Sequence, residues 1–202
     1  MPGPLAVPIY YGLAHIGRAI VQGLASQALP AATAGAVVGG GYVASNMIQA
    51  NQAAQEEQAR TRERASAVTC ATCRDNPCAA EAAGVPGSKY RGGAHGATRY
   101  PTNDGMHSHH TPAKDASFLH ENVGPAIQMD PMDHGDTASY GSGRFAKEYR
   151  ATQSELINSG RFMEAVMMDV ADIKSLFGNK YDEAIAQMLR YAECLKRNGI
   201  VQ

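Results

Sequence analysis

Histidines gather in one segment of the chain, where they could bind a cation or transfer a proton. Five of the seven His residues lie between His107 and His134. Four of them fall in two short motifs, Met106-His-Ser-His-His110 and Asp130-Pro-Met-Asp-His134. A neutral imidazole is the commonest metal ligand and also titrates near pH 7, so adjacent histidines can divide cation binding and proton transfer between them. The cluster favours such chemistry over a solvated tract that binds metal adventitiously.

The doublet His109-His110 places a condition on the backbone. Neighbouring residues of a regular strand point to opposite faces, so both imidazoles reach one site only if the strand bends there. Pro112 is expected to end this strand, because proline cannot donate to a sheet ladder.

The four cysteines offer a second, separate site. Cys70, Cys73 and Cys78 lie close together, and Cys194 stands alone near the end of the chain. Four thiols allow a four-sulfur zinc site, disulfides or unpaired thiols, and the spacing leaves these open. A zinc site would require the last helix to bring Cys194 to the other three.

Residues 1–50 are distinguished by their lack of charge. No Asp, Glu, Lys, Arg or His occurs from Ala19 to Gln55, and two apolar runs flank a turn at Pro30. Each run is long enough to span a bilayer as a helix, although Ala and Gly gain little from transfer into lipid. The residues before the first run carry no basic charge, so no cleavable secretory signal is expected. We expect an Ala/Gly-rich helical hairpin that serves delivery or associates with a membrane.

The rest of the chain divides by composition. Residues 51–67 are rich in Gln, Ala, Glu and Arg, which predicts a polar helical linker. The glycines of residues 84–105 indicate a loop or short hairpin. Beyond Gly141, apolar residues at helical spacing predict three helices that end at Gly160, Gly178 and Gly199. Residues 68–202 then form the main domain.

Several motifs of this domain, taken in order, resemble a known family. They are Tyr90-Arg-Gly-Gly-Ala-His-Gly96, Ser108-His-His110 with Pro112, Gly124-Pro-Ala-Ile-Gln-Met-Asp130 with Asp133-His134, Thr137-Ala-Ser139, and the ending from Asp172 to Asp182. Over about residues 70–197 the chain resembles the His-His toxin nucleases of the HNH/endonuclease VII superfamily.

The resemblance implies a fold and a set of catalytic roles. The fold would be α+β and mainly helical, with a small beta-beta-alpha metal-finger core, the three C-terminal helices and the N-terminal apolar hairpin. In that family the first His of the pair binds the cation and the second is the general base, which assigns these roles to His109 and His110. His134 would be the second protein ligand of one divalent ion, Mg, Mn, Zn or Ni.

The chain departs from the family pattern at two positions. Colicin-type relatives add a further His one helical turn on, where this chain has Ala138. The third ligand is therefore open between Asp133, Asp130 and water. The asparagine of the superfamily name has no clear counterpart, with Asn122 the nearest option.

Substrate binding must come from local charge. Lys and Arg number 18 against 19 for Asp and Glu, so net charge gives no general attraction to nucleic acid. Basic side chains near the histidines are expected to contact phosphates, with His95 as a further candidate. These candidates are Lys89, Arg91, His95, Lys114 and Arg144.

The leading interpretation is a metal-dependent, non-specific DNA endonuclease that acts as an antibacterial toxin. The resemblance implies a cognate immunity protein, secretion by the producing bacterium, possible contact with secretion-apparatus proteins such as those of type VI systems, transient membrane contact and action in the target-cell cytoplasm. One alternative is a membrane-active effector without nuclease activity, in which residues 5–48 cause the damage and the C-terminal half is a regulatory or zinc-binding Cys/His module. Another is a non-enzymatic domain with a structural zinc at Cys70, Cys73, Cys78 and Cys194.

Overall fold

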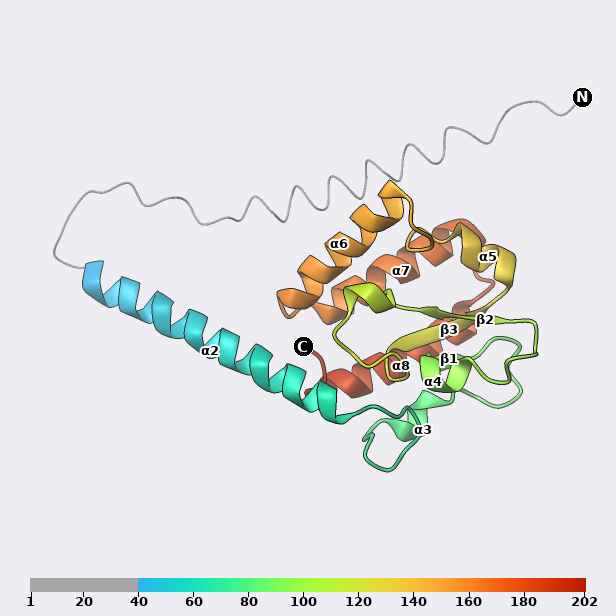
Figure 1. The fold of residues 1–202 in the computed structure, drawn as a ribbon, viewed down its shortest axis with the longest axis horizontal. Helices are drawn as coiled ribbons and strands as arrows, with labels where there is room; N and C mark the ends of the chain where they lie inside the picture. Colours follow the sequence, from blue (N-terminus) through green and yellow to red (C-terminus); the bar gives the residue numbers. More distant parts are fainter. Residues whose placement is uncertain (1–39) are drawn as a thin grey trace, which may run out of the picture. The chain divides into compact units, whose positions relative to one another are not determined.

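The computed structural model describes residues 40–202 of the chain (Figure 1). This part is mixed α+β and mainly helical, with one small antiparallel sheet, as predicted in outline. In chain order the elements are α2 (Gly40–Ala67), α3 (Ala79–Ala82), β1 (Gly92–Ala94), α4 (His95–Thr98), β2 (His107–His110), a 3-10 turn η1 (Lys114–Ala116), β3 (Pro125–Met129), α5 (Pro131–Asp136), α6 (Arg144–Asn158), α7 (Phe162–Phe177) and α8 (Asp182–Arg197). The folded unit treated below is Ile48–Gln202.

The predicted apolar hairpin of residues 1–50 lies almost entirely outside the described residues. Between residues 40 and 202, no helix combines the length and the apolarity needed to cross a membrane.

Helix α2 contains the predicted polar helix of residues 51–67. Its sequence is dominated by good helix formers, which explains its regularity. Its last turns are not solvated as a linker would be, since Thr61 and Ala65 are buried. The side chain of Gln58 donates to the backbone oxygen of Asn158 (3.0 Å), and Arg62 donates to the Asn158 side chain (2.8 Å). The end of α2 therefore packs against the end of α6.

The sheet has the strand order β1-β3-β2, with both pairs antiparallel. β3 is the central strand, and all its residues are buried, including Gln128. Because both of its faces are covered, its sequence does not alternate between polar and apolar residues. Pairing with β2 runs regularly from His107 opposite Met129 to His110 opposite Ala126. β2 thus ends two residues before Pro112, as expected.

The glycine-rich segment of residues 84–105 is not simply a loop, because it contains β1 and α4. Its glycines allow the close approach of other backbone segments. A Cβ atom added to Gly92 would lie 1.8 Å from the carbonyl oxygen of Ala184 in α8, and one on Gly93 would lie 2.2 Å from that of Ala82. α8 can therefore pack directly across β1 and β3 (Figure 1).

Helices α6, α7 and α8 confirm the three predicted C-terminal helices. Gly160, Gly178 and Gly199 follow their ends with φ of +73°, +60° and +63°, a backbone conformation that glycine adopts without a Cβ penalty. Most of the predicted apolar positions are buried. Phe145, in the first turn of α6, is an exception, because it is 53% exposed.

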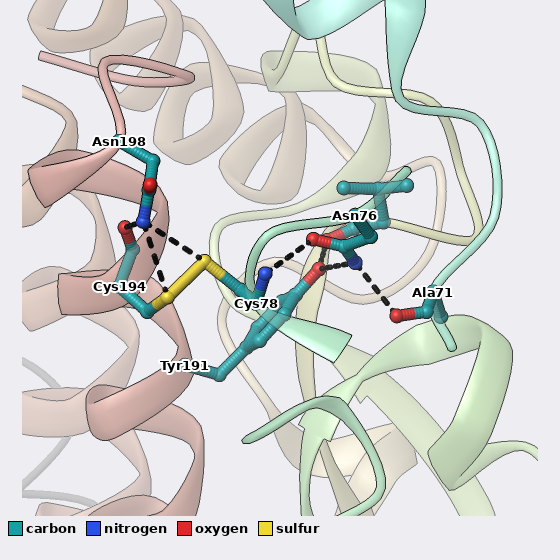
Figure 2. Close-up of a disulfide and its surroundings, with 7 residues drawn as sticks. Ala71, Asn76, Cys78, Tyr191, Cys194 and Asn198 are labelled. Atoms are coloured by element: carbon teal, nitrogen blue, oxygen red, sulfur yellow. Dashed lines mark hydrogen bonds between the residues drawn. A yellow bond between two sulfur atoms is a disulfide. The ribbon is translucent and has the colours of Figure 1, made fainter. Parts of the chain in front are cut away.

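The cysteines form two disulfides, Cys70–Cys73 and Cys78–Cys194. The second joins the segment before α3 to α8, so the last helix brings Cys194 to Cys78 (Figure 2). Asn76 supports this link by accepting the N–H of Cys78 at 2.9 Å. With both disulfides formed, none of the four cysteines offers a free thiolate to zinc.

Candidate functional site

The histidines of β2 divide between the two faces of the strand. His107 and His109 lie on one face, and Ser108 and His110 lie on the other, as the regular pairing with β3 requires. The bend that would bring His109 and His110 to one face is absent, because the ladder continues through His110. Two separate groups of side chains result.

The first group, called the three-histidine cluster below, consists of His107, His109 and His134. The Nδ1 atoms of His107 and His134 lie 3.1 Å apart, so one donates to the other when both rings are neutral. The ring of His109 meets that of His134 edge-on, with centroids 5.1 Å apart. The ring of Tyr140 lies 4.9 Å from His134. The rings of His107, His109 and Tyr140 therefore all pack against His134.

Short helix α5, which carries His134, lies beside β2 (Figure 1). Pro131 stands in its first turn, where the missing N–H costs no helical hydrogen bond. The backbone N–H of Asp130 donates to the hydroxyl of Tyr181 at 3.1 Å, which ties the start of α5 to the start of α8. The chain order β2, β3, α5 therefore brings His109 and His134 together, although they are distant in sequence.

His109 is almost completely enclosed, at 3% exposure. Within the described part of the chain, its Nε2 atom has no hydrogen-bond partner. Burial, with smaller contributions from His134 and His110, lowers the pKa of His109 to about 3. Burial also lowers the pKa of His134 to about 4, with His107 acting in the same direction. Both rings are therefore neutral at pH 7 and have a nitrogen lone pair.

The second group, called the His110 group below, lies on the other face of β2 and comprises His95, Ser108, His110 and Glu121. His110 Nε2 lies 3.1 Å from the backbone oxygen of Glu121. A carbonyl only accepts, so the hydrogen sits on Nε2 and the neutral ring keeps its lone pair on Nδ1. Burial lowers the pKa of His110, which favours this neutral form.

A chain of hydroxyls fixes the tautomer of His95 in the same way. The hydroxyl of Thr98 donates to the backbone oxygen of Ala94 at 3.1 Å, so it must accept from Ser108, 2.7 Å away. Ser108 in turn accepts from His95 Nδ1 at 2.9 Å. The unprotonated nitrogen of His95 is then Nε2, and burial lowers the pKa of this ring to about 4.

Glu121 brings a negative charge to this face. Its two oxygens lie 3.8 Å from His95 Nε2 and 3.6 Å from Lys114 Nζ. The positive charge of Lys114 lowers the pKa of Glu121, which is ionised at pH 7. Neighbouring Gly124 leaves room for His110, since a Cβ atom there would lie 3.0 Å from the His110 ring. The group therefore combines two neutral imidazoles, a carboxylate and an ammonium.

The acidic candidates for a third metal ligand have other partners. Asp133 accepts hydrogen bonds from Lys180 and from the Tyr181 hydroxyl, each at 2.6 Å. Asp130 accepts from Tyr90 at 3.0 Å and forms an ion pair with Lys180 at 2.7 Å. These contacts join α5 to the start of α8, so the structure uses both carboxylates as anchors of α5.

The basic candidates fall in three places, and one of these is beside Glu121, where Lys114 lies. Lys89 and Arg91 line an open cavity of about 630 Å³ together with Gln128, whose partner in the ladder is Ser108. The cavity therefore opens on the face of the His110 group. Some of the N–H donors of the Arg91 guanidinium already have partners, namely the Gln128 side chain and the backbone oxygens of Ala83 and Tyr100. Arg144 lies elsewhere, paired with Glu148 on the exposed start of α6.

Sequence reasoning missed two members of these groups, His107 and Glu121, and the hydroxyl partner of Ser108, Thr98. It gave His107 no role, and it did not single out Glu121 or Thr98. Only the i, i+2 spacing of His107 and His109 could have signalled a shared face. Nothing in the sequence indicates that the backbone oxygen of Glu121 binds His110.

The three-histidine cluster has the donors that a divalent ion needs. The rings of His109 and His134 are neutral, and the buried Nε2 of His109 is unpartnered among the described residues. In the described residues, however, no three His, Cys, Asp or Glu side chains already converge on one point suitable for an ion.

Comparisons with protein-family models, curated proteins and solved structures find no match to this chain.

Proposed function

We propose that this chain is a metal-dependent, largely non-specific endonuclease that hydrolyses DNA and acts as an antibacterial toxin. The observation that carries the proposal is the approach of His134 to His109, with ring centroids 5.1 Å apart. The resemblance of the sequence to HNH toxin nucleases requires these two side chains to meet, from a strand and from the helix after the next strand. The order β2, β3, α5 supports a beta-beta-alpha core of this kind.

His109 and His134 are the residues that would hold the ion. The lone pair of His109 Nε2 is free of protein partners among the described residues, which suits a ligand. A divalent ion at this position supplies positive charge to a scissile phosphate and stabilises the leaving oxygen. The protein holds the ligands in place by burying His109 and by anchoring α5 through Asp130.

His110 is the proposed general base. Its Nε2 hydrogen is fixed on the backbone oxygen of Glu121, so its Nδ1 lone pair can take a proton from the attacking water. Because His109 and His110 leave β2 on opposite sides, the proposal requires the scissile phosphate to lie across the end of the strand, between the ion and the base. This separation of ligand and base by one peptide unit is a specific feature of the proposal.

Phosphate binding falls to the basic residues on the face of the His110 group. Lys89 lines the open cavity, and Lys114 extends from η1 towards Glu121. Contacts of these side chains with the DNA backbone would be independent of sequence and weakened by salt. Arg144 is a further candidate contact, because its pair with Glu148 is an exposed, weak ion pair that a phosphate can replace.

The biological setting is also part of the proposal. A toxin of this class is secreted, acts in the target-cell cytoplasm and is inhibited by a cognate immunity protein. The two disulfides support secretion, since such bonds persist in oxidising compartments. Residues 1–50 would serve delivery, through contacts with a membrane or a secretion apparatus.

The test is incubation of the full chain with supercoiled plasmid. Separate reactions contain Mg²⁺, Mn²⁺, Zn²⁺, Ni²⁺ or a chelator, and a structured RNA replaces the plasmid in parallel. We expect nicked and linear DNA with at least one ion and none with the chelator. Failure of every ion to support cleavage would refute the nuclease. In expressing cells, loss of membrane potential before DNA damage would instead favour the membrane-active alternative.

A further inference from the structure

We propose that His107 is a metal ligand, and that His107, His109 and His134 together bind one divalent transition-metal ion. The inference concerns the same site as the proposed nuclease and supplies the third protein ligand that the sequence left open. The inference rests on the proposed function only for the role of the ion in catalysis. Binding of the ion is inferred from the arrangement of the three histidines alone.

The first argument is the spacing of two nitrogens. His107 Nδ1 and His134 Nδ1 lie 3.1 Å apart. Two imidazoles that bind one ion at about 2.0–2.1 Å have their nitrogens about 2.8–3.4 Å apart, for angles between octahedral and tetrahedral values. The two side chains therefore already stand at the separation of neighbouring ligands, although one comes from β2 and the other from α5.

The second argument is the unpartnered nitrogen of His109. This side chain is 97% buried and its Nε2 atom finds no hydrogen bond among the described residues. Leaving a buried polar atom without a partner costs about 1–3 kcal/mol, so such an atom calls for an explanation. Its ring lies edge-on against that of His134, so an ion held by His107 and His134 would give this nitrogen a partner once the His109 ring turned towards the ion.

The third argument is access. His107 is exposed, while His109 closes the inner side of the cluster. An ion can therefore enter from solvent past His107 and keep positions for water or a phosphate oxygen. Three protein ligands with an open position are typical of catalytic rather than structural sites.

The donor set also limits the metal. Asp130 and Asp133 are held by Lys180, which leaves a site of imidazole nitrogens without a carboxylate. Imidazoles suit Zn²⁺, Ni²⁺, Cu²⁺ and Fe²⁺, whereas Mg²⁺ and Ca²⁺ prefer oxygen ligands. We infer that the site selects a transition metal over Mg²⁺.

The experiment measures ion binding directly, without reference to activity. Full-length protein is freed of metal with a chelator and titrated calorimetrically with Zn²⁺ and with Mg²⁺. The variants are His107→Ala and, as a matched control, His120→Ala, which removes an exposed histidine outside the cluster. Circular dichroism checks that both are folded. We expect one Zn²⁺ per wild-type chain, no Mg²⁺ binding at equal concentration, an affinity about 100-fold lower for His107→Ala, and no change for His120→Ala.

A second measurement keeps the inference testable if His107→Ala does not fold. In ¹⁵N spectra of wild-type protein, Zn²⁺ should shift Nδ1 of His107 and His134 and Nε2 of His109. Wild-type affinity in His107→Ala, or an unshifted His107, would overturn the inference. Zinc binding that depends on His107 without DNA cleavage would leave it standing and refute the nuclease. DNA cleavage that only Mg²⁺ supports, at the same rate in His107→Ala as in wild type, would overturn the inference and leave the nuclease standing.

Discussion

The rings of His95 and His110 stack on each other, with centroids 4.0 Å apart and planes 23° apart. They come from α4 and from β2, so the stacking joins the two elements on the face opposite the three-histidine cluster. Each ring has one nitrogen fixed by a neighbour, Ser108 for His95 and the backbone of Glu121 for His110. The orientation of the proposed base thus depends on residues beyond the His-His doublet.

Ser108→Ala should release the tautomer of His95. The substitution removes both the acceptor of His95 Nδ1–H and the donor to Thr98, and unpaired polar groups of this kind cost about 1–3 kcal/mol. Urea unfolding should show this loss, and ¹⁵N spectra should show His95 as a mixture of tautomers. Ser142→Ala, at an exposed position, should change neither. A single unchanged tautomer in Ser108→Ala would show that the hydroxyl chain does not control His95.

Gly92→Ala should destabilise the fold by about 3 kcal/mol or more, because its Cβ would lie 1.8 Å from the backbone oxygen of Ala184 and force β1 away from α8. The control is Gly135→Ala in α5, where an added Cβ meets nothing within 4 Å. Urea unfolding of both variants measures the difference. Equal stabilities would mean that β1 and α8 are not in direct contact.

The two disulfides should differ in their contribution to stability. Cys78–Cys194 closes a sequence separation of 116 residues and Cys70–Cys73 one of 3. On the chain-entropy model the first contributes about 5 kcal/mol and the second about 2 kcal/mol. Replacing each pair with serines and measuring urea unfolding tests this order. A larger loss for the Cys70/Cys73 pair would contradict it.

Asp169 should make stability fall as pH rises. Burial raises its pKa to about 8, with Asp172 adding to the effect and the hydrogen bond from Gln153 opposing it. Between about pH 4 and pH 8 the folded state therefore holds a proton that the unfolded state has lost. The unfolding free energy then decreases by about 1.4 kcal/mol per pH unit in this window.

Asp169→Asn removes this titration while keeping the shape of the side chain. The difference in unfolding free energy between wild type and variant should therefore change across pH 4–8 and level off above it. A constant difference over this range would mean that Asp169 is ionised in the folded state.

The sequence predicted those parts of the fold that depend on local patterns. Apolar periodicity gave α6, α7 and α8, and glycine placed their ends at Gly160, Gly178 and Gly199. It did not predict β1, because this strand exists only through pairing with β3, more than thirty residues away, and through its contact with α8. Short strands rich in glycine carry no alternation that would reveal them.

The candidate site was predictable in its residue types and less so in its geometry. The resemblance selected His109, His110 and His134, and the structure brings the first and the third together. Asp133 could not be judged from sequence, because its partners Lys180 and Tyr181 come from a segment much later in the chain. For the same reason, the contact of His110 with the Glu121 backbone emerges only from the tertiary structure.

The most direct test of the account is the rate of metal-dependent plasmid cleavage by His110→Ala. The wild-type chain and His120→Ala, which loses a histidine outside both groups, are measured beside it with the ion that supports the fastest cleavage. Removal of a well-placed general base lowers a rate by about 100- to 10,000-fold, and we expect a loss in this range for His110→Ala and none for His120→Ala. Cleavage by His110→Ala at the wild-type rate would contradict the account.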